Sequence, residues 1–154
     1  MIDEPTRDRI DALAQRFPER RGALLGALQL VQREAGFVSR EACVELAELF
    51  AIRPNEVQEL VSFYNLLYDA PQGRHHVNVC TNLPCSLRGA RDLLRALEAH
   101  LGVRAGETTD DGRITLGHEE CLGACAWAPV VRIDERYCED VDAESAKALV
   151  DELE

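Results

Sequence analysis

The sequence predicts a small helical bundle followed by an open α/β sheet with few strands. Over residues 1–74, apolar residues recur at helical spacing. A Pro- and Gly-containing stretch, residues 69–73, interrupts this pattern. Beyond it, short apolar runs typical of strands alternate with amphipathic helical segments. We therefore expect two domains, a helical bundle over residues 1–72 and an α/β domain over residues 73–154.

Four short helices are expected in the first domain, joined by loops of a few residues. Gly36 is expected to end the second helix as a C-cap, and Ser39 to begin the third as an N-cap. Pro54 fits the first turn of the fourth helix, where its missing N–H does no harm. The residues expected to face the core are, helix by helix, Ile10, Leu13, Ala14 and Phe17; Leu24, Leu25, Leu28 and Val31; Val44, Ala47 and Phe50; and Val57, Leu60, Val61, Tyr64 and Leu67.

The second domain is expected to run β-α-β-β-β-α or β-α-β-β-α. Gly102 is placed to end its first helix, and Asp142 is placed to cap its last helix. The expected strands are His75–Val79, Arg113–Leu116, Val130–Ile133 and Tyr137–Val141, and the expected helices are Gly89–Leu101 and Ala143–Leu153.

Composition excludes several classes of protein. The chain has 154 residues, of which 46% are hydrophobic, so it is not intrinsically disordered. Its net charge of −11 argues against a nucleic-acid binder or a protein that binds anionic membranes. Its longest apolar stretch, Gly22–Val31, is too short to cross a bilayer, and the acidic N-terminus does not resemble a secretory signal. We therefore expect a cytoplasmic protein, whose six cysteines do not form a disulfide framework.

Four of the cysteines form two pairs. Cys80 and Cys85 are separated by four residues, and Cys121 and Cys125 by three. Each pair is expected on a loop just after a strand, and loops at the same end of neighbouring strands converge. Four converging thiolates would repel one another without a metal, so the pattern predicts a metal site.

Three chemistries remain open for these cysteines. Zinc prefers short C-x2-4-C pairs around one ion, which would make the chain a zinc-binding interaction module. A [2Fe–2S] cluster spreads two thiolates over each of two irons, and wider, unequal spacings favour it. A thioredoxin-like thiol enzyme using Cys80 and Cys85 is the third, although no C-x2-C is present. No phosphate-binding glycine motif and no catalytic triad is visible, which favours a carrier that is not catalytic on its own.

The strings VSFYNLLYDAPQGRHHVNVCTNLPCSLRGARDLL and LGVRAGETTDDGRITLGHEECLGACAWAPVVRID closely resemble the small [2Fe–2S] subunit of NADH:quinone oxidoreductase (respiratory complex I). Related subunits occur in NAD-dependent formate dehydrogenases and NAD-reducing hydrogenases. The resemblance runs from about residue 20 to the C-terminus and implies a helical bundle followed by a thioredoxin-like domain. It implies that Cys80, Cys85, Cys121 and Cys125 ligate one [2Fe–2S] cluster.

The resemblance also implies partners. A flavoprotein subunit would bind FMN and NAD(H), which this chain is not expected to hold, and would exchange electrons with the cluster. Further subunits would complete a larger redox complex, which would keep the chain at the cytoplasmic membrane without inserting it.

Other polar residues are expected to have structural roles. Cys43 is interpreted as a buried thiol and Cys138 as a structural one. His75 and His76 are not needed as ligands, because four cysteines already complete the set. His118 could donate a hydrogen bond near Cys121, but a surface role suits it better.

Overall fold

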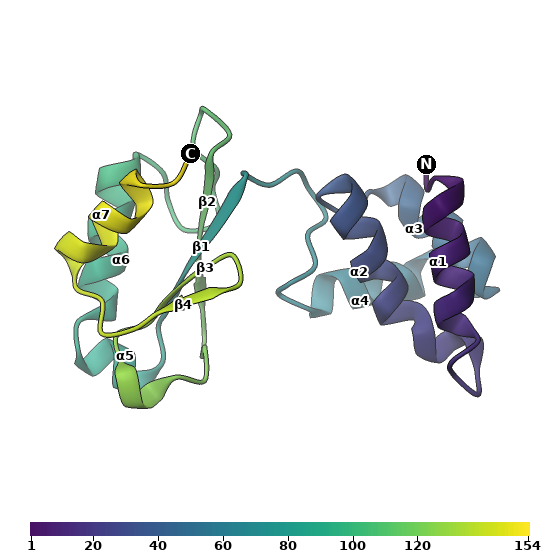
Figure 1. Ribbon diagram of the computed structural model, residues 1–154, viewed down its shortest axis with the longest axis horizontal. Helices are drawn as coiled ribbons and strands as arrows, with labels where there is room; N and C mark the ends of the chain where they lie inside the picture. The colour runs from purple at the N-terminus through teal and green to yellow at the C-terminus, as the bar shows by residue number, and fades with distance from the viewer. The chain divides into compact units, whose positions relative to one another are not determined.

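The computed structural model describes residues 1–154 and divides into two compact units, Met1–Pro71 and Gln72–Glu154 (Figure 1). The first unit contains only helices, and the second contains a four-stranded sheet with helices. This order agrees with the predicted fold class. The assignment of residues 1–72 and 73–154 as separate domains stays a prediction.

The helical unit consists of α1 (Glu4–Ala14), a 3-10 turn η1 (Arg20–Ala23), α2 (Leu24–Ala35), α3 (Arg40–Phe50) and α4 (Pro54–Phe63). Gly36 ends α2 with a left-handed φ of 81°, a conformation that glycine adopts without steric cost. Ser39 begins α3 by accepting a hydrogen bond from the Ala42 N–H at 3.2 Å. Both predicted caps are therefore confirmed.

The core of the helical unit follows the predicted stripes with three exceptions. Ile10, Leu28 and Leu46 are completely buried. Phe17 is exposed because α1 ends at Ala14, before the expected last turn. Two further predictions are wrong. Val44 is exposed because the buried face of α3 is formed by other residues, among them Cys43 and Leu46. Tyr64 is exposed because α4 ends at Phe63.

The second unit consists of β1 (His75–Cys80), α5 (Leu83–Leu87), α6 (Ala90–Leu101), β2 (Ile114–Glu119), a 3-10 turn η2 (Cys125–Trp127), β3 (Val131–Ile133), β4 (Arg136–Cys138) and α7 (Ala143–Asp151). The strands lie in the order β2-β1-β3-β4. β1 pairs in parallel with β2 and antiparallel with β3, so the sheet is mixed. The connection from β1 to β2 runs through α5 and α6, as a parallel pair requires.

Helices α6 and α7 pack against each other beside the sheet (Figure 1). Val77, Val79 and Leu116 from the strands are fully buried in the same core as Leu93 and Leu97 of α6. The C-terminal strand prediction was too long, because β4 ends at Cys138 and the chain then turns toward α7. The short helix α5 was not predicted at all.

None of the helices is both long and apolar enough to cross a membrane.

Asp134 closes the turn between β3 and β4 and ties it to β1. Its carboxylate accepts a hydrogen bond from the His76 N–H and contacts His75 Nδ1, both at 2.8 Å. Partial burial would raise the pKa of this carboxyl group, but the hydrogen bonds from His75 and His76 outweigh it and lower the pKa. Asp134 also has a left-handed φ of 53°, which asparagine tolerates equally well.

Replacing Asp134 with asparagine should lower the free energy of unfolding at pH 7 by about 1 kcal/mol, because a half-exposed charged acceptor is lost. The folded state lowers the pKa of Asp134, so its stabilisation is present above the ordinary pKa of an aspartate. It disappears as the pH falls through the pKa of the folded state. Urea unfolding measured from pH 7 to pH 3 should therefore show that the difference in unfolding free energy between wild type and variant becomes smaller as the pH falls. A difference independent of pH would contradict this account.

Candidate metal centre

The first cysteine pair lies at the carboxyl end of the central strand. Cys80 is the last residue of β1, and its side chain is buried beside that of Cys85. Cys85 lies inside α5, where Asn82 caps the helix by accepting a hydrogen bond from the Leu83 N–H. The expectation that Cys85 lies on a loop is therefore wrong. The chain between Cys80 and Cys85 begins a short helix, because Asn82 caps it and Pro84 fits its first turn.

The second pair follows the neighbouring strand and is exposed. Cys121 comes two residues after β2 ends, and Cys125 begins the turn η2. Between them, Gly123 has a left-handed φ of 76°, and its N–H donates to the Cys121 Sγ at 3.3 Å. A side chain at this position would strain that conformation, so the glycine lets the loop direct an N–H at sulfur.

The two pairs come together because β1 and β2 are parallel neighbours. Cys80 lies opposite Glu119 in the ladder, so the segments that follow both strands leave the sheet at the same end. Burial and the adjacent Cys80 thiol raise the pKa of Cys85 to about 11, while the Val130 N–H acts in the opposite direction. Burial and the charge of Cys121 raise the pKa of Cys125, and Cys80 contributes to the same shift from the other pair.

This donor set fits a cluster with two metal ions. Cys80 and Cys121 act most strongly on the pKa of their own pair-mates, Cys85 and Cys125, and a weaker electrostatic effect links the two pairs. No group of three or more histidine, cysteine or acidic side chains is arranged to hold a metal ion in this structure. Two thiolates on each of two irons is the arrangement that a [2Fe–2S] rhomb needs. The N–H groups of Gly123 and Val130 are directed at the sulfurs, where they would stabilise negative charge.

Exposed apolar side chains lie close in sequence to Cys85 and Cys125. Leu83 and Leu87 of α5 lie two residues before and after Cys85, with 69% and 78% of their surface exposed. Trp127, two residues after Cys125, is 56% exposed. We call these three residues the cysteine-loop patch. The patch was not predicted from the sequence, although leucines at both sides of a ligand-like cysteine are a usable signal.

A polar link connects the two parts of the patch. Arg88 follows α5 and forms an ion pair with Asp140 at 2.9 Å, and the Asp140 N–H donates to the Trp127 carbonyl at 2.8 Å. Through Asp140, the residue that follows α5 is therefore linked to the last residue of η2. The ion pair of Arg88 with Asp140 was not predicted.

The remaining candidates lie outside this group. Cys43 is buried in the helical unit, where burial raises the pKa of its thiol. Cys138 is half-buried in β4, His118 is exposed, and His75 contacts Asp134. These positions agree with the structural roles expected for them.

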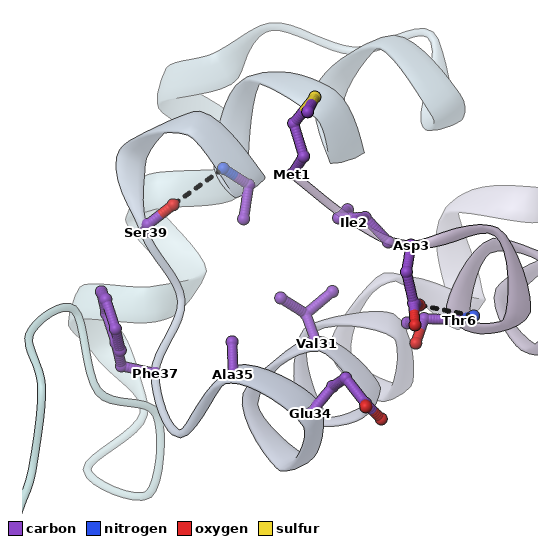
Figure 2. Close-up of a pocket in the computed structure, with 10 residues that line it drawn as sticks. Met1, Ile2, Asp3, Thr6, Val31, Glu34, Ala35, Phe37 and Ser39 are labelled. Carbon is purple, nitrogen blue, oxygen red and sulfur yellow. Dashed lines mark hydrogen bonds between the residues drawn. The ribbon is translucent and has the colours of Figure 1, made fainter.

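A pocket of about 370 Å³ lies elsewhere, in the helical unit (Figure 2). Ile2 and Val31 form part of its wall, while Asp3 and Ser39 are already engaged in capping α1 and α3. None of its lining residues is a cysteine, so it is separate from the candidate metal centre. The lining residues are Met1, Ile2, Asp3, Thr6, Val31, Glu34, Ala35, Phe37, Ser39 and Ala42.

Comparison of the sequence with known proteins identifies a family to which it is similar. The family model for thioredoxin-like [2Fe-2S] ferredoxins matches residues 10–154. The chain is 41% identical over 145 residues to a subunit of the NADH-quinone oxidoreductase of Rhizobium meliloti (strain 1021), covering 94% of this chain and 86% of that protein. It is 35% identical over 148 residues to mitochondrial NADH dehydrogenase [ubiquinone] flavoprotein 2 of Dictyostelium discoideum, covering 94% of this chain and 60% of that protein.

A solved structure agrees with this assignment. The air-oxidised NAD+-reducing [NiFe]-hydrogenase contains a region that matches with a TM-score of 0.72 at 26% identity. The match covers 83% of this chain and 22% of the much longer hydrogenase chain. The family model covers most of the sequence, including all four paired cysteines. The chain therefore belongs to the thioredoxin-like [2Fe-2S] ferredoxin family.

Proposed function

We propose that the chain is an electron-transfer subunit of an NADH:quinone oxidoreductase and carries one [2Fe–2S] cluster. The observation that supports the proposal most is that the two cysteine pairs follow the same end of the parallel strands β1 and β2 and influence one another electrostatically. Family membership and the names of the relatives support the same function. When bound, the cluster would accept and release one electron at a time.

The proposed ligands are Cys80, Cys85, Cys121 and Cys125. The buried pair would hold the site within the protein core, and the exposed pair would face the surface. Gly123 would hold the second loop in place through its N–H. No residue of this chain is assigned to a bond-breaking step, and its role is to bind, orient and insulate the redox group.

The electron partner in this proposal is a flavoprotein subunit that binds FMN and NAD(H). The test is anaerobic purification of the chain alone and together with such a subunit. The chain alone should show iron, inorganic sulfide, visible absorption bands and an EPR signal after reduction by dithionite. NADH should reduce these bands only when the flavoprotein is present. A colourless protein containing one zinc ion would refute the proposal.

The cysteine-loop patch is the surface where we expect the flavoprotein to approach, because electron transfer requires the redox groups to lie close together. Replacing Leu87 with glutamate should weaken the complex with the flavoprotein about tenfold, since an exposed apolar contact becomes a desolvated charge. Iron content should not change, because the Leu87 side chain points to solvent. Surface plasmon resonance measures the affinity.

Tyr137→Glu provides the control, because Tyr137 is exposed on the separate strand β4 and should leave affinity unchanged. Equal affinities for wild type and the Leu87→Glu variant would remove the patch from the docking surface.

A further inference from the structure

A groove between α1 and α2 has a charge opposite to that of the chain as a whole. The two helices pack side by side in the helical unit (Figure 1), and a hollow of about 440 Å³ runs between them. Its walls follow the same helical spacing on both helices, so each wall is one continuous face. We call it the α1–α2 groove, and its residues are Arg9, Ala12, Leu13 and Arg16 from α1 and the segment after it, and Gly26, Gln29, Leu30 and Arg33 from α2.

The floor of the groove is apolar. Leu13 and Leu30 are only partly covered, although both pack against the core of the unit. A methyl group added at Gly26 would come within 2.7 Å of Leu13 Cδ2, so this glycine lets Leu13 lie against α2. The floor therefore presents apolar surface that nothing within the unit covers completely.

The rim is basic. Three arginines and no acidic residue line the groove, in a chain with 28 acidic and 17 basic residues. Arg9 contacts Glu34 at 3.0 Å, whereas Arg16 and Arg33 form no ion pair. The neighbouring acid Asp11 is engaged by Arg20. Two guanidinium groups thus remain free to receive carboxylates across an apolar floor.

We propose that the α1–α2 groove is a docking site for an acidic amphipathic helix of a partner chain. A third helix laid against a helix pair places its apolar face on the floor. Carboxylates at the borders of that face would meet Arg16 and Arg33, whose long stems can also cover apolar surface. The net negative charge of this chain would disfavour such a helix at most other surfaces, so the groove also provides selectivity.

The test uses the full-length protein and a synthetic helical peptide with leucines on one face and glutamates at its borders. Fluorescence anisotropy should show saturable binding that weakens with added salt. The double variant Arg16→Glu/Arg33→Glu should weaken binding about tenfold or more. The control Arg40→Glu/Arg74→Glu carries the same charge change outside the groove, and its affinity should stay near that of wild type. Circular dichroism verifies that each variant is folded.

Two further peptides test whether binding requires both the apolar face and the acidic borders of the helix. A peptide with serines in place of the leucines, and one with lysines in place of the glutamates, should both lose binding. Equal binding of the serine peptide would mean non-specific attraction of polyanions and would overturn the proposal. So would binding that the Arg16→Glu/Arg33→Glu change leaves intact, or self-association of the chain that this change abolishes. None of these readouts depends on the metal centre.

A photo-crosslinker at Gln29 tests the same groove in the native assembly. Gln29 lines the groove and is exposed. Mass spectrometry should locate the crosslink in an acidic helical segment of a partner chain, whereas a crosslinker at Glu48, on α3, should not reach that segment. A crosslink from Gln29 to a basic segment or to a second copy of this chain would contradict the proposal.

Discussion

Replacing Cys85 with alanine is expected to remove most of the iron and the visible absorption from the purified protein. Its side chain is 1% exposed and lies beside Cys80, so the variant would leave one iron with a single thiolate from this pair. Cys43 belongs to the other compact unit and Cys138 to β4, so neither thiol is a member of the two pairs. Iron and sulfide analysis together with EPR of the reduced sample measures the loss.

The matched controls for this prediction are Cys43→Ala and Cys138→Ala. Both remove a thiol, but neither thiol belongs to the two pairs, so both variants should keep their iron. Far-UV circular dichroism should show that Cys85→Ala keeps its helices, which separates loss of metal from failure to fold. Full iron in the Cys85→Ala variant, or loss of iron from Cys138→Ala, would refute the ligand assignment.

Replacing Leu116 with alanine should have the largest effect on stability. Leu116 is fully buried in β2 opposite Val77 of the central strand. Removing three carbon atoms leaves a cavity beneath α6 and α7, which should cost about 2–5 kcal/mol of unfolding free energy. Trp127 is the single tryptophan and lies in this unit, so its fluorescence in urea reports unfolding of this unit specifically.

Leu87→Ala is the control for that measurement, because it deletes the same atoms from a side chain that is 78% exposed. Its unfolding free energy should differ from wild type by less than about 0.5 kcal/mol. If Leu116→Ala and Leu87→Ala lowered the unfolding free energy by similar amounts, burial of Leu116 would not determine the stability of the sheet.

Much of the fold could be predicted because its signals are local. Gly36, Ser39 and Asp142 mark helix ends through capping chemistry that acts over three or four residues. Errors arose where tertiary packing decides the outcome. Val44 and Phe17 fit an apolar stripe, but the first lies outside the buried face of α3 and the second lies beyond the end of α1.

The sequence predicts which residues form the candidate site, and it says less about how those residues are arranged. The spacing of Cys80, Cys85, Cys121 and Cys125 identifies two pairs, and a parallel strand arrangement brings them together. Spacing does not reveal that one pair is buried and the other exposed, because burial depends on how α5 packs against the sheet. The ion pair of Arg88 with Asp140 joins residues far apart in sequence, which no local pattern indicates.

The position of β1 at the middle of the sheet has a consequence for synthesis of the chain. His75 pairs with Ile114 and Val77 with Ile133, so β1 gains both its neighbours only after much of the remaining chain has left the ribosome. The helical unit, whose contacts are more local, can fold earlier. Cys80 and Cys85 are synthesised before Cys121 and Cys125, so all four proposed ligands are present only after the segment that follows β2 has emerged. Metal is therefore expected to bind after most of the chain has been translated. We expect the nascent chain to need a reducing environment during that interval.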